Sequence, residues 1–222
     1  MRIVNLSEHN SLLGCFLREI RDVRIQNDPL RFRRNIERIG EVMALEVSRS
    51  LRYRTEQVQT PLGTADVSII ADPIVLGTIM RAGLPLHQGF LNMFDRAENA
   101  FLSAYRRVAG QKENGEPELE IVAEYLAAPR LDGKTLLLVD PMLATGMSME
   151  VAYRALLSHG HPAHTHLCCT IATPQAIEYL ERTLADEPVT LWCAAIDPVL
   201  NEKKYIVPGL GDAGDLCFGE KL

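Results

Sequence analysis

The chain has 222 residues, of which 47% are hydrophobic and 23% charged, a composition that fits one globular domain with a substantial core. Its formal net charge of -6 gives no electrostatic footprint for nucleic acid, so an acidic ligand would be held by a few local arginines. The first residues do not form a charged segment followed by an apolar one, as a secretion signal does, and no apolar run approaches the roughly 18 residues of a membrane span. The five cysteines lack the spacing of metal ligands. We therefore expect a cytoplasmic protein in a reducing compartment, with no membrane and no nucleic-acid partner.

The first hundred residues predict helices that alternate with strands. Asp28 is a suitable N-cap and Pro29 a suitable first residue for a helix whose apolar residues recur at helical spacing up to Val47. The other face of this helix carries a basic cluster, for which we favour a solvated surface over an anion site: Arg31, Arg33, Arg34 and Arg38. Strands near 68–71 and 74–80, a helix over 84–94 and a strand over 100–105 follow. This alternation predicts a parallel sheet.

The pattern changes between about residues 106 and 130. Asn114-Gly115 is a hairpin turn signal, and the apolar residues from Leu119 to Tyr125 alternate as in a half-buried strand. We expect a projecting β-arm here.

The remaining sequence returns to the α/β pattern. We expect a strand over 136–139, then a helix from Met149 to His159 that ends at Gly160. After it we expect a strand over 166–172, a helix that begins at Thr173 and Pro174, and a strand over 189–196. The last segment, about 197–222, is expected to form a tail that covers a site. No repeat, low-complexity tract or linker marks a boundary, so we expect a single α/β domain over 1–222.

The most informative motif begins at the end of the strand over 136–139. Asp140 falls at the carboxyl end of this buried strand, where open α/β sheets bind ligands. Thr145, Gly146, Met147 and Ser148 then bring hydroxyl and backbone N–H groups to the start of a helix, which suits an anion. The loop lacks both the Lys-Ser/Thr of a P-loop and a G-x-G-x-x-G pattern. We interpret Asp140 as an acceptor for a ribose diol beside a 5′-phosphate cradle, the alternative being an acid that only caps the helix.

Four motifs in order resemble the uracil phosphoribosyltransferases. The run from Asp140 to Ser148 is similar to their ribose 5-phosphate loop, and the segment from Tyr205 to Asp215 to their uracil-binding signature. Arg81-Ala-Gly-Leu84 resembles their pyrophosphate loop, and Tyr105-Arg106 the root of their mobile arm. The resemblance covers most of the chain, from about residue 17 to 219. It implies a type I phosphoribosyltransferase fold, a parallel sheet flanked by helices with a projecting β-arm and a small hood from the N- and C-terminal segments.

The resemblance also implies the reaction and its site. Uracil and 5-phosphoribosyl 1-diphosphate would give UMP and diphosphate, a step of pyrimidine salvage. The catalytic residues would be Arg81, Arg106, Asp140 and Asp212. The phosphoribosyl substrate would contact these residues and Pro141, Met142, Leu143, Ala144, Thr145, Gly146, Met147 and Ser148. Uracil would contact Tyr205, Ile206, Gly211, Asp212 and Ala213, largely through the backbone.

The charges of this reaction explain the arginines. Negative charge grows on the leaving pyrophosphate, so fixed donors there lower the barrier, and the guanidinium fork suits phosphate oxygens. Mg²⁺ would be held through substrate and water, because Pro141 stands where some phosphoribosyltransferases keep a second acid. The family further implies a tight turn after Arg81 with a non-proline cis peptide, and close approach at Gly83.

Weaker interpretations stand beside several of these residues. Arg81 could form only a surface salt bridge, and Asp212 could be a turn residue bonded to its own backbone. Three residues depart from the family pattern: Arg107 replaces an acid or amide, Met147 a second glycine, and Leu216 a basic residue. For His161, His164 and His166 we favour a structural role over a metal site.

Two other functions are kept open. The first is a related phosphoribosyltransferase for another nucleobase, and the second a catalytically weak nucleotide-binding regulator. Members of the family commonly form dimers or tetramers and some are activated by GTP, so the resemblance implies a homo-oligomer and a GTP effector as hypotheses.

Overall fold

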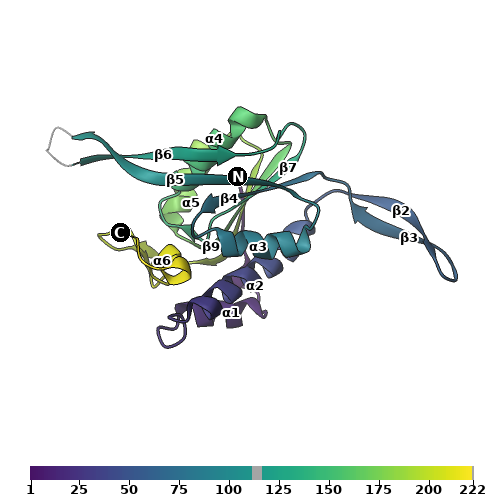
Figure 1. Cartoon of the computed structure of the whole chain (residues 1–222), viewed down its shortest axis with the longest axis horizontal. Coiled ribbons are helices and arrows are strands. Elements are labelled where there is room, and N and C mark those ends of the chain that lie inside the picture. Colours follow the sequence, from purple (N-terminus) through teal and green to yellow (C-terminus); the bar gives the residue numbers. More distant parts are fainter. Residues whose placement is uncertain (112–116, 222) are drawn as a thin grey trace.

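A computed structural model describes residues 1–111 and 117–221, and within 104–124 it describes the backbone only. Its centre is an eight-stranded sheet (Figure 1). The order across the main path is β1 (Arg2–Asn5), β10 (Val189–Ile196), β9 (His164–Ala172), β7 (Thr135–Val139), β4 (Ile74–Met80), β5 (Glu98–Gln111) and β6 (Pro117–Ala127), and the short β8 (Met142–Leu143) also pairs with β9. All pairs are parallel except β5 with β6. The expected α/β fold class is confirmed.

Helices cover both faces of this sheet (Figure 1). α1 (Leu13–Arg21), α2 (Pro29–Ser48) and α3 (Leu84–Met93) lie on one face, and α4 (Met147–Leu156) and α5 (Pro174–Thr183) on the other. Two short 3-10 helices, Leu6–Glu8 and Leu157–His159, complete these layers. In β7, Leu137 and Val139 pack into the core under α1 to α3, whereas Leu136 and Leu138 pack under α4 and α5. The uninterrupted apolar run of β7 therefore reflects burial on both sides.

The chain changes direction across the sheet between β4 and β7. From β4 it moves outward to β5 and β6, and it then returns to β7 and continues through β9 to β10. These two directions place helices on opposite faces, which leaves a crevice at the carboxyl ends of β4 and β7. Arg81 and Asp140 directly follow these two strands.

The two ends of the chain meet to form the hood. The C-terminal part holds a small antiparallel pair, β11 (Val199–Leu200) with β12 (Ile206–Val207), and the helix α6 (Ala213–Phe218). α6 packs on α2, where Arg33 Nη1 donates to the carbonyl oxygen of Cys217 at 2.6 Å. Asp28 caps α2 as predicted, accepting from the N–H groups of Leu30 and Arg31. The other members of the basic cluster are engaged on the surface: Arg31 pairs with Glu19, Arg34 with Glu37, and Arg38 donates to Asn35.

Several elements differ from the predictions. The strand expected near 68–71 is the end of β3 (Gly63–Ile70), which pairs with β2 (Tyr53–Thr60) in a separate hairpin outside the main sheet. The prediction that this strand belongs to the parallel sheet was wrong. Its partner β2 is largely polar and was not predicted as a strand, so the antiparallel hairpin was not recognised. β1 and α1 were also missed. β5 and β6 form the expected β-arm, which projects on the side of the sheet opposite this hairpin (Figure 1), while the turn expected at Asn114-Gly115 lies outside the described residues.

Two sets of side chains behave as core residues. Four of the five cysteines are buried and only Cys15 is exposed. His166 accepts a hydrogen bond at Nδ1 from the indole Nε1 of Trp192 at 3.0 Å, and burial lowers its pKa to about 4. In the part of the chain that the structure describes, no helix is long and apolar enough to cross a membrane.

Candidate active site

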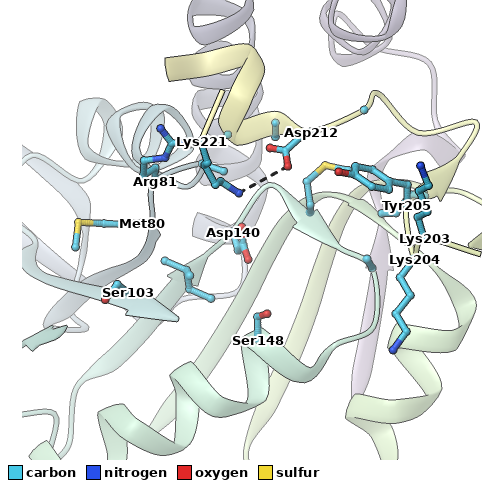
Figure 2. A pocket seen from close by; sticks show the side chains of 18 residues that line it. Met80, Arg81, Ser103, Asp140, Ser148, Lys203, Lys204, Tyr205, Asp212 and Lys221 are labelled. Carbon is cyan, nitrogen blue, oxygen red and sulfur yellow. Dashed lines mark ion pairs between the residues drawn. The ribbon is translucent and has the colours of Figure 1, made fainter. Parts of the chain in front are cut away.

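A cavity of about 690 Å³ lies at the crevice between β4 and β7 (Figure 2). In this view Arg81 and Tyr205 lie at its two sides, Asp140 lies between them, and Ser148 points up from α4. The cavity therefore joins the loop at Arg81, the loop from Asp140 to Ser148 and the C-terminal segment. Its lining comprises Ile79, Met80, Arg81, Ala82, Ser103, Asp140, Met142, Ala144, Ser148, Lys203, Lys204, Tyr205, Ile206, Gly211, Asp212, Ala213, Gly214 and Lys221.

Asp140 occupies the centre of this cavity. Its backbone N–H donates to the carbonyl oxygen of Cys168 at 3.0 Å, which fixes the residue as a continuation of the sheet. Burial raises the pKa of the Asp140 carboxyl to about 7, and a hydrogen bond from the backbone of Met142 opposes this shift. α4 has Gly146 as its N-cap, so Asp140 is not the capping acid of that helix. A carboxyl kept partly neutral and aimed at a cavity is suited to bind hydroxyl groups.

The loop from Asp140 to Ser148 divides between two environments. Met142, Ala144 and Ser148 line the main cavity, whereas Thr145 and Met147 line a second cavity of about 530 Å³ against α5. Pro141, Leu143 and Gly146 are buried and line neither cavity. The substrate contacts expected of these three residues, and of Thr145 and Met147, therefore stay predictions; the structure adds that the loop packs against α5 as well as the main cavity.

Gly146 is the residue that allows this loop to turn. It has φ +80°, and a Cβ there would lie 2.9 Å from Cδ1 of Tyr179 and 3.0 Å from the carbonyl oxygen of Ala176. Met147 is the first residue of α4. Its side chain faces the second cavity, so the methionine does not narrow the main one.

Arg81 connects the loop after β4 to the C-terminal helix α6 and the residue that follows it. Its Nη2 lies 3.3 Å from Oδ1 of Asp215 and donates to the carbonyl oxygen of Gly219, also at 3.3 Å. The expected non-proline cis peptide is present, but it precedes Arg81, at Met80–Arg81. Gly83 serves packing, because a Cβ there would lie 2.3 Å from Oγ1 of Thr78 in β4. Arg81 thus combines the cavity position with the salt bridge that was its alternative interpretation.

The C-terminal segment forms the other wall. Tyr205 is 42% exposed and Ile206 5% exposed, and Gly211, Asp212 and Ala213 continue the lining. Asp212 caps α6 by accepting from the N–H of Asp215 at 3.0 Å, and its Oδ2 lies 3.8 Å from Nζ of Lys221 (dashed in Figure 2). The backbone role that was the alternative for Asp212 is therefore present, together with a place in the cavity. Leu216 packs partly buried against the core.

Arg106 lies on β5 opposite Ile121 of β6. The structure describes the backbone there and not its side chain, so its role stays a prediction.

Three lysines and a serine of the lining were missed in the sequence: Lys203, Lys204, Lys221 and Ser103. Lys204 has φ +61°, which non-glycine residues seldom adopt, and it lines both cavities. The basic pair directly before Tyr205 was the signal that could have identified two of them. Ser103 had no such signal, because it enters through the parallel register that sets it opposite Met80.

Comparisons with known proteins agree with this geometry. The family model described as uracil phosphoribosyltransferase matches residues 7–220. A curated uracil phosphoribosyltransferase of Porphyromonas gingivalis is 54% identical over 222 residues, all of both chains, and one of Methanothermobacter thermautotrophicus is 40% identical over 194 residues, 86% of this chain and 85% of the relative. A solved structure, the AQ2163 protein from Aquifex aeolicus, superposes with a TM-score of 0.84 at 30% identity and covers 98% of both chains.

A parallel sheet with its cavity at the β4–β7 switch, an acid after β7 and a hood of both chain ends define a phosphoribosyltransferase of type I architecture. The matches in sequence extend from end to end and cover the cavity residues on both walls. The chain belongs to the uracil phosphoribosyltransferase family.

Proposed function

We propose that the protein transfers the 5-phosphoribosyl group of 5-phosphoribosyl 1-diphosphate to N1 of uracil, in the cavity between β4, β7 and the C-terminal segment. The observation that carries this assignment is the place of Asp140, at the centre of a cavity with Arg81 on one side and Tyr205 on the other (Figure 2). The cavity volume of about 690 Å³ is enough to hold a substrate of this size, with the pyrophosphate towards Arg81 and the base towards Tyr205.

The phosphoribosyl substrate would lie across the carboxyl ends of the strands. The Asp140 carboxylate would accept hydrogen bonds from the two ribose hydroxyls, and Ser148 would donate to the 5′-phosphate at the start of α4. Arg81 would contact the pyrophosphate with donors that Asp215 and Gly219 leave free, since its guanidinium carries five N–H groups. Arg106 would approach from the β-arm.

The chemical step would break the bond from C1′ to the pyrophosphate oxygen, form the bond from C1′ to N1 of uracil, and release the N1 proton to the departing pyrophosphate or to solvent. As the bond from C1′ to the pyrophosphate lengthens, negative charge grows at the leaving oxygen, and Arg81, Arg106 and Lys221 would stabilise it electrostatically. Asp140 would hold the ribose in place while C1′ moves towards N1 of uracil. These contacts strengthen with the charge and therefore favour the transition state over the bound substrate.

Uracil would lie beside Tyr205 with its polar edge towards the backbone from Ile206 to Ala213. Uracil offers an acceptor, a donor and an acceptor along this edge, and backbone N–H and C=O groups can match them at fixed positions. Cytosine would present a donor in place of one acceptor. One unpaired buried group weakens binding by roughly 1–3 kcal/mol, which is about tenfold or more.

Mg²⁺ is the cofactor that the substrate implies. Two carboxylates of the described lining, Asp140 and Asp212, face the cavity, and Asp212 is shared between the α6 cap and Lys221. This donor set suits an ion that arrives with the pyrophosphate and contacts the protein through water. Bound in this way, the ion would neutralise charge on the leaving group.

Four further expectations stay predictions. We propose a cytoplasmic enzyme that acts as a single domain, assembles as a homo-oligomer and responds to GTP. Sedimentation with and without GTP, with activity measured in parallel, would test the last two.

The decisive experiment measures nucleotide formation by the purified protein with 5-phosphoribosyl 1-diphosphate and Mg²⁺. Uracil, cytosine, thymine, hypoxanthine and orotate would be offered separately, with and without GTP. Conversion of uracil alone supports the proposal. Conversion of another base would favour a relative of different specificity, and binding of UMP without turnover of any base would favour a regulator.

A further inference from the structure

An ion pair outside the cavity holds the loop that would read the base. The base loop, residues 206–211, runs from Ile206 at the start of β12 to Gly211, and both of these residues line the cavity. Gly209 of this loop lines no described cavity. Its backbone groups are hydrogen-bonded to Arg21, at the end of α1, and to Asp197, directly after β10.

Asp197 supplies the first set of contacts to Gly209. Asp197 follows β10, where its own N–H donates to the carbonyl oxygen of Ala172 at 2.9 Å. Its carboxylate is almost entirely buried, with its side chain 7% exposed. Oδ2 of this carboxylate accepts the backbone N–H of Gly209 at 2.8 Å. The sheet thereby fixes a backbone donor of the base loop.

Arg21 supplies the second set of contacts. Arg21 is the last residue of α1, and its guanidinium meets the Asp197 carboxylate with both terminal nitrogens, Nη1 to Oδ2 at 2.7 Å and Nη2 to Oδ1 at 2.9 Å. Nη1 also donates to the carbonyl oxygen of Gly209 at 3.1 Å. Both backbone groups of Gly209 are therefore bonded to one fork-to-fork ion pair, the geometry that gives arginine its directional strength.

The shape of the base loop explains why it needs this support. Gly209 has φ +57°, and a Cβ there would lie 2.1 Å from the carbonyl oxygen of Ile206. The chain thus folds back on Ile206, three positions before Gly209 and one of the residues whose backbone would read uracil. Gly211, another of them, follows two positions later. A displacement of Gly209 would shift both recognition groups together.

We propose that Arg21 and Asp197 are positioning residues that hold the base loop in its uracil-reading conformation before the base binds. The inference rests on the proposed reading of uracil by Ile206 and Gly211. A loop fixed in advance loses less conformational freedom on binding, so the pair contributes to base affinity and to rejection of cytosine without contacting either. Asp140 and Ser148 lie on other elements, so we expect the phosphoribosyl end to depend on the pair less than the base end does.

The test compares steady-state kinetics of Arg21→Ala, Asp197→Asn and wild type with uracil and 5-phosphoribosyl 1-diphosphate varied separately. We expect KM for uracil to rise about tenfold in each variant, with KM for 5-phosphoribosyl 1-diphosphate changed by less than about twofold, and the preference for uracil over cytosine to fall. Added guanidinium ion at non-denaturing concentration should lower KM for uracil in Arg21→Ala alone, because it can refill the site that the substitution empties.

Arg24→Ala is the matched control. Arg24 lies three residues beyond Arg21 and also forms a two-pronged pair with an aspartate, Asp22, but that pair is exposed and contacts no part of the base loop. This variant should keep the wild-type KM for uracil. Equal changes in both KM values, or loss of active protein without a change in KM, would assign the pair to general stability and overturn the proposal.

Amide hydrogen exchange of the substrate-free protein separates this inference from the proposed function. In Arg21→Ala, peptides that span 206–211 should exchange faster while those of β7 and β9 stay protected. Unchanged exchange at 206–211 would overturn the positioning role, whatever the reaction. Failure of the wild type to convert uracil, with the exchange effect present, would overturn the uracil assignment and leave the loop support standing.

Discussion

The guanidinium Nη2 of Arg81 lies 3.3 Å from the carboxylate of Asp215, a residue 134 positions later in the chain. The loop after β4 is thereby joined to α6. If Arg81 binds pyrophosphate as proposed, the anion must share the guanidinium with this carboxylate, whose charge opposes anion binding. The pair would then set both the position and the effective charge of the proposed leaving-group site.

Asp215→Asn is expected to strengthen inhibition by pyrophosphate. The substitution keeps an oxygen for Arg81 but removes a negative charge, and because the pair is partly exposed the gain should be about two- to fivefold in the inhibition constant. Product inhibition at constant ionic strength would measure it. Asp186→Asn, which changes an exposed carboxylate that does not line the cavity, is the control. Weaker inhibition in Asp215→Asn would show that the carboxylate orients Arg81 more than it competes with the substrate.

Asp140 should give activity a pH dependence. The pKa of its carboxyl in the free protein is about 7, because burial disfavours the charge. The charged form is the better acceptor for ribose hydroxyls, so kcat/KM for 5-phosphoribosyl 1-diphosphate should rise between pH 6 and pH 8. Asp140→Asn should lose most activity and the pH dependence of this step. A flat profile in the wild type would contradict the assignment.

The raised pKa of Asp140 should also make the folded protein less stable at higher pH. The pKa of Asp140 is raised in the folded protein to about 7 from a reference of 3.8, so between these values the folded state holds a proton that the unfolded state has released. This contribution makes the protein less stable as pH rises from about 4 to about 7, and it levels off above that. At about 1.4 kcal/mol per unit of pKa shift, Asp140→Asn should therefore exceed the wild type in free energy of unfolding by up to ~4 kcal/mol at pH 8 and match it near pH 4. Urea denaturation at the two pH values measures this difference.

The sequence predicts the place of a residue well when its contacts lie within its own segment, and poorly when they come from a distant one. Asp140 and Gly146 belong to a strand–loop–helix unit whose pattern is local, and the structure places Asp140 directly after β7 and Gly146 directly before α4 as predicted. Arg21 and Asp197 meet across 176 positions, so neither carries a local signal that points to the other. The β2–β3 hairpin was missed for a different reason, since its strands pair only with each other and lack the apolar run of a buried strand. Thr145 and Met147 were expected in the 5′-phosphate cradle, and spacing alone could not show that both line the second cavity against α5.

Gly146→Ala should impair both stability and substrate binding. The new Cβ would press on Tyr179 and Ala176 of α5, and alanine is strained at φ +80°. We expect a loss of ~1–3 kcal/mol in the free energy of unfolding and a higher KM for 5-phosphoribosyl 1-diphosphate, because the loop must shift away from α5. Gly14→Ala in α1 is the control, since its Cβ would meet nothing within 4 Å and alanine favours a helix. Equal stability of the two variants would contradict the packing role of Gly146.

Ser148 and Met147 are neighbours in the first turn of α4 whose side chains serve different cavities. Ser148 lines the main cavity, so Ser148→Ala should raise KM for 5-phosphoribosyl 1-diphosphate about tenfold, the effect of losing one hydrogen bond to a charged group. Met147 lines the cavity against α5, so Met147→Ala should raise this KM less than Ser148→Ala does. Ser158→Ala, at an exposed serine beyond the same helix, controls for the loss of a hydroxyl. If Met147→Ala had the larger effect, the 5′-phosphate would bind on the α5 side of the loop, and Thr145 rather than Ser148 would be its hydroxyl donor.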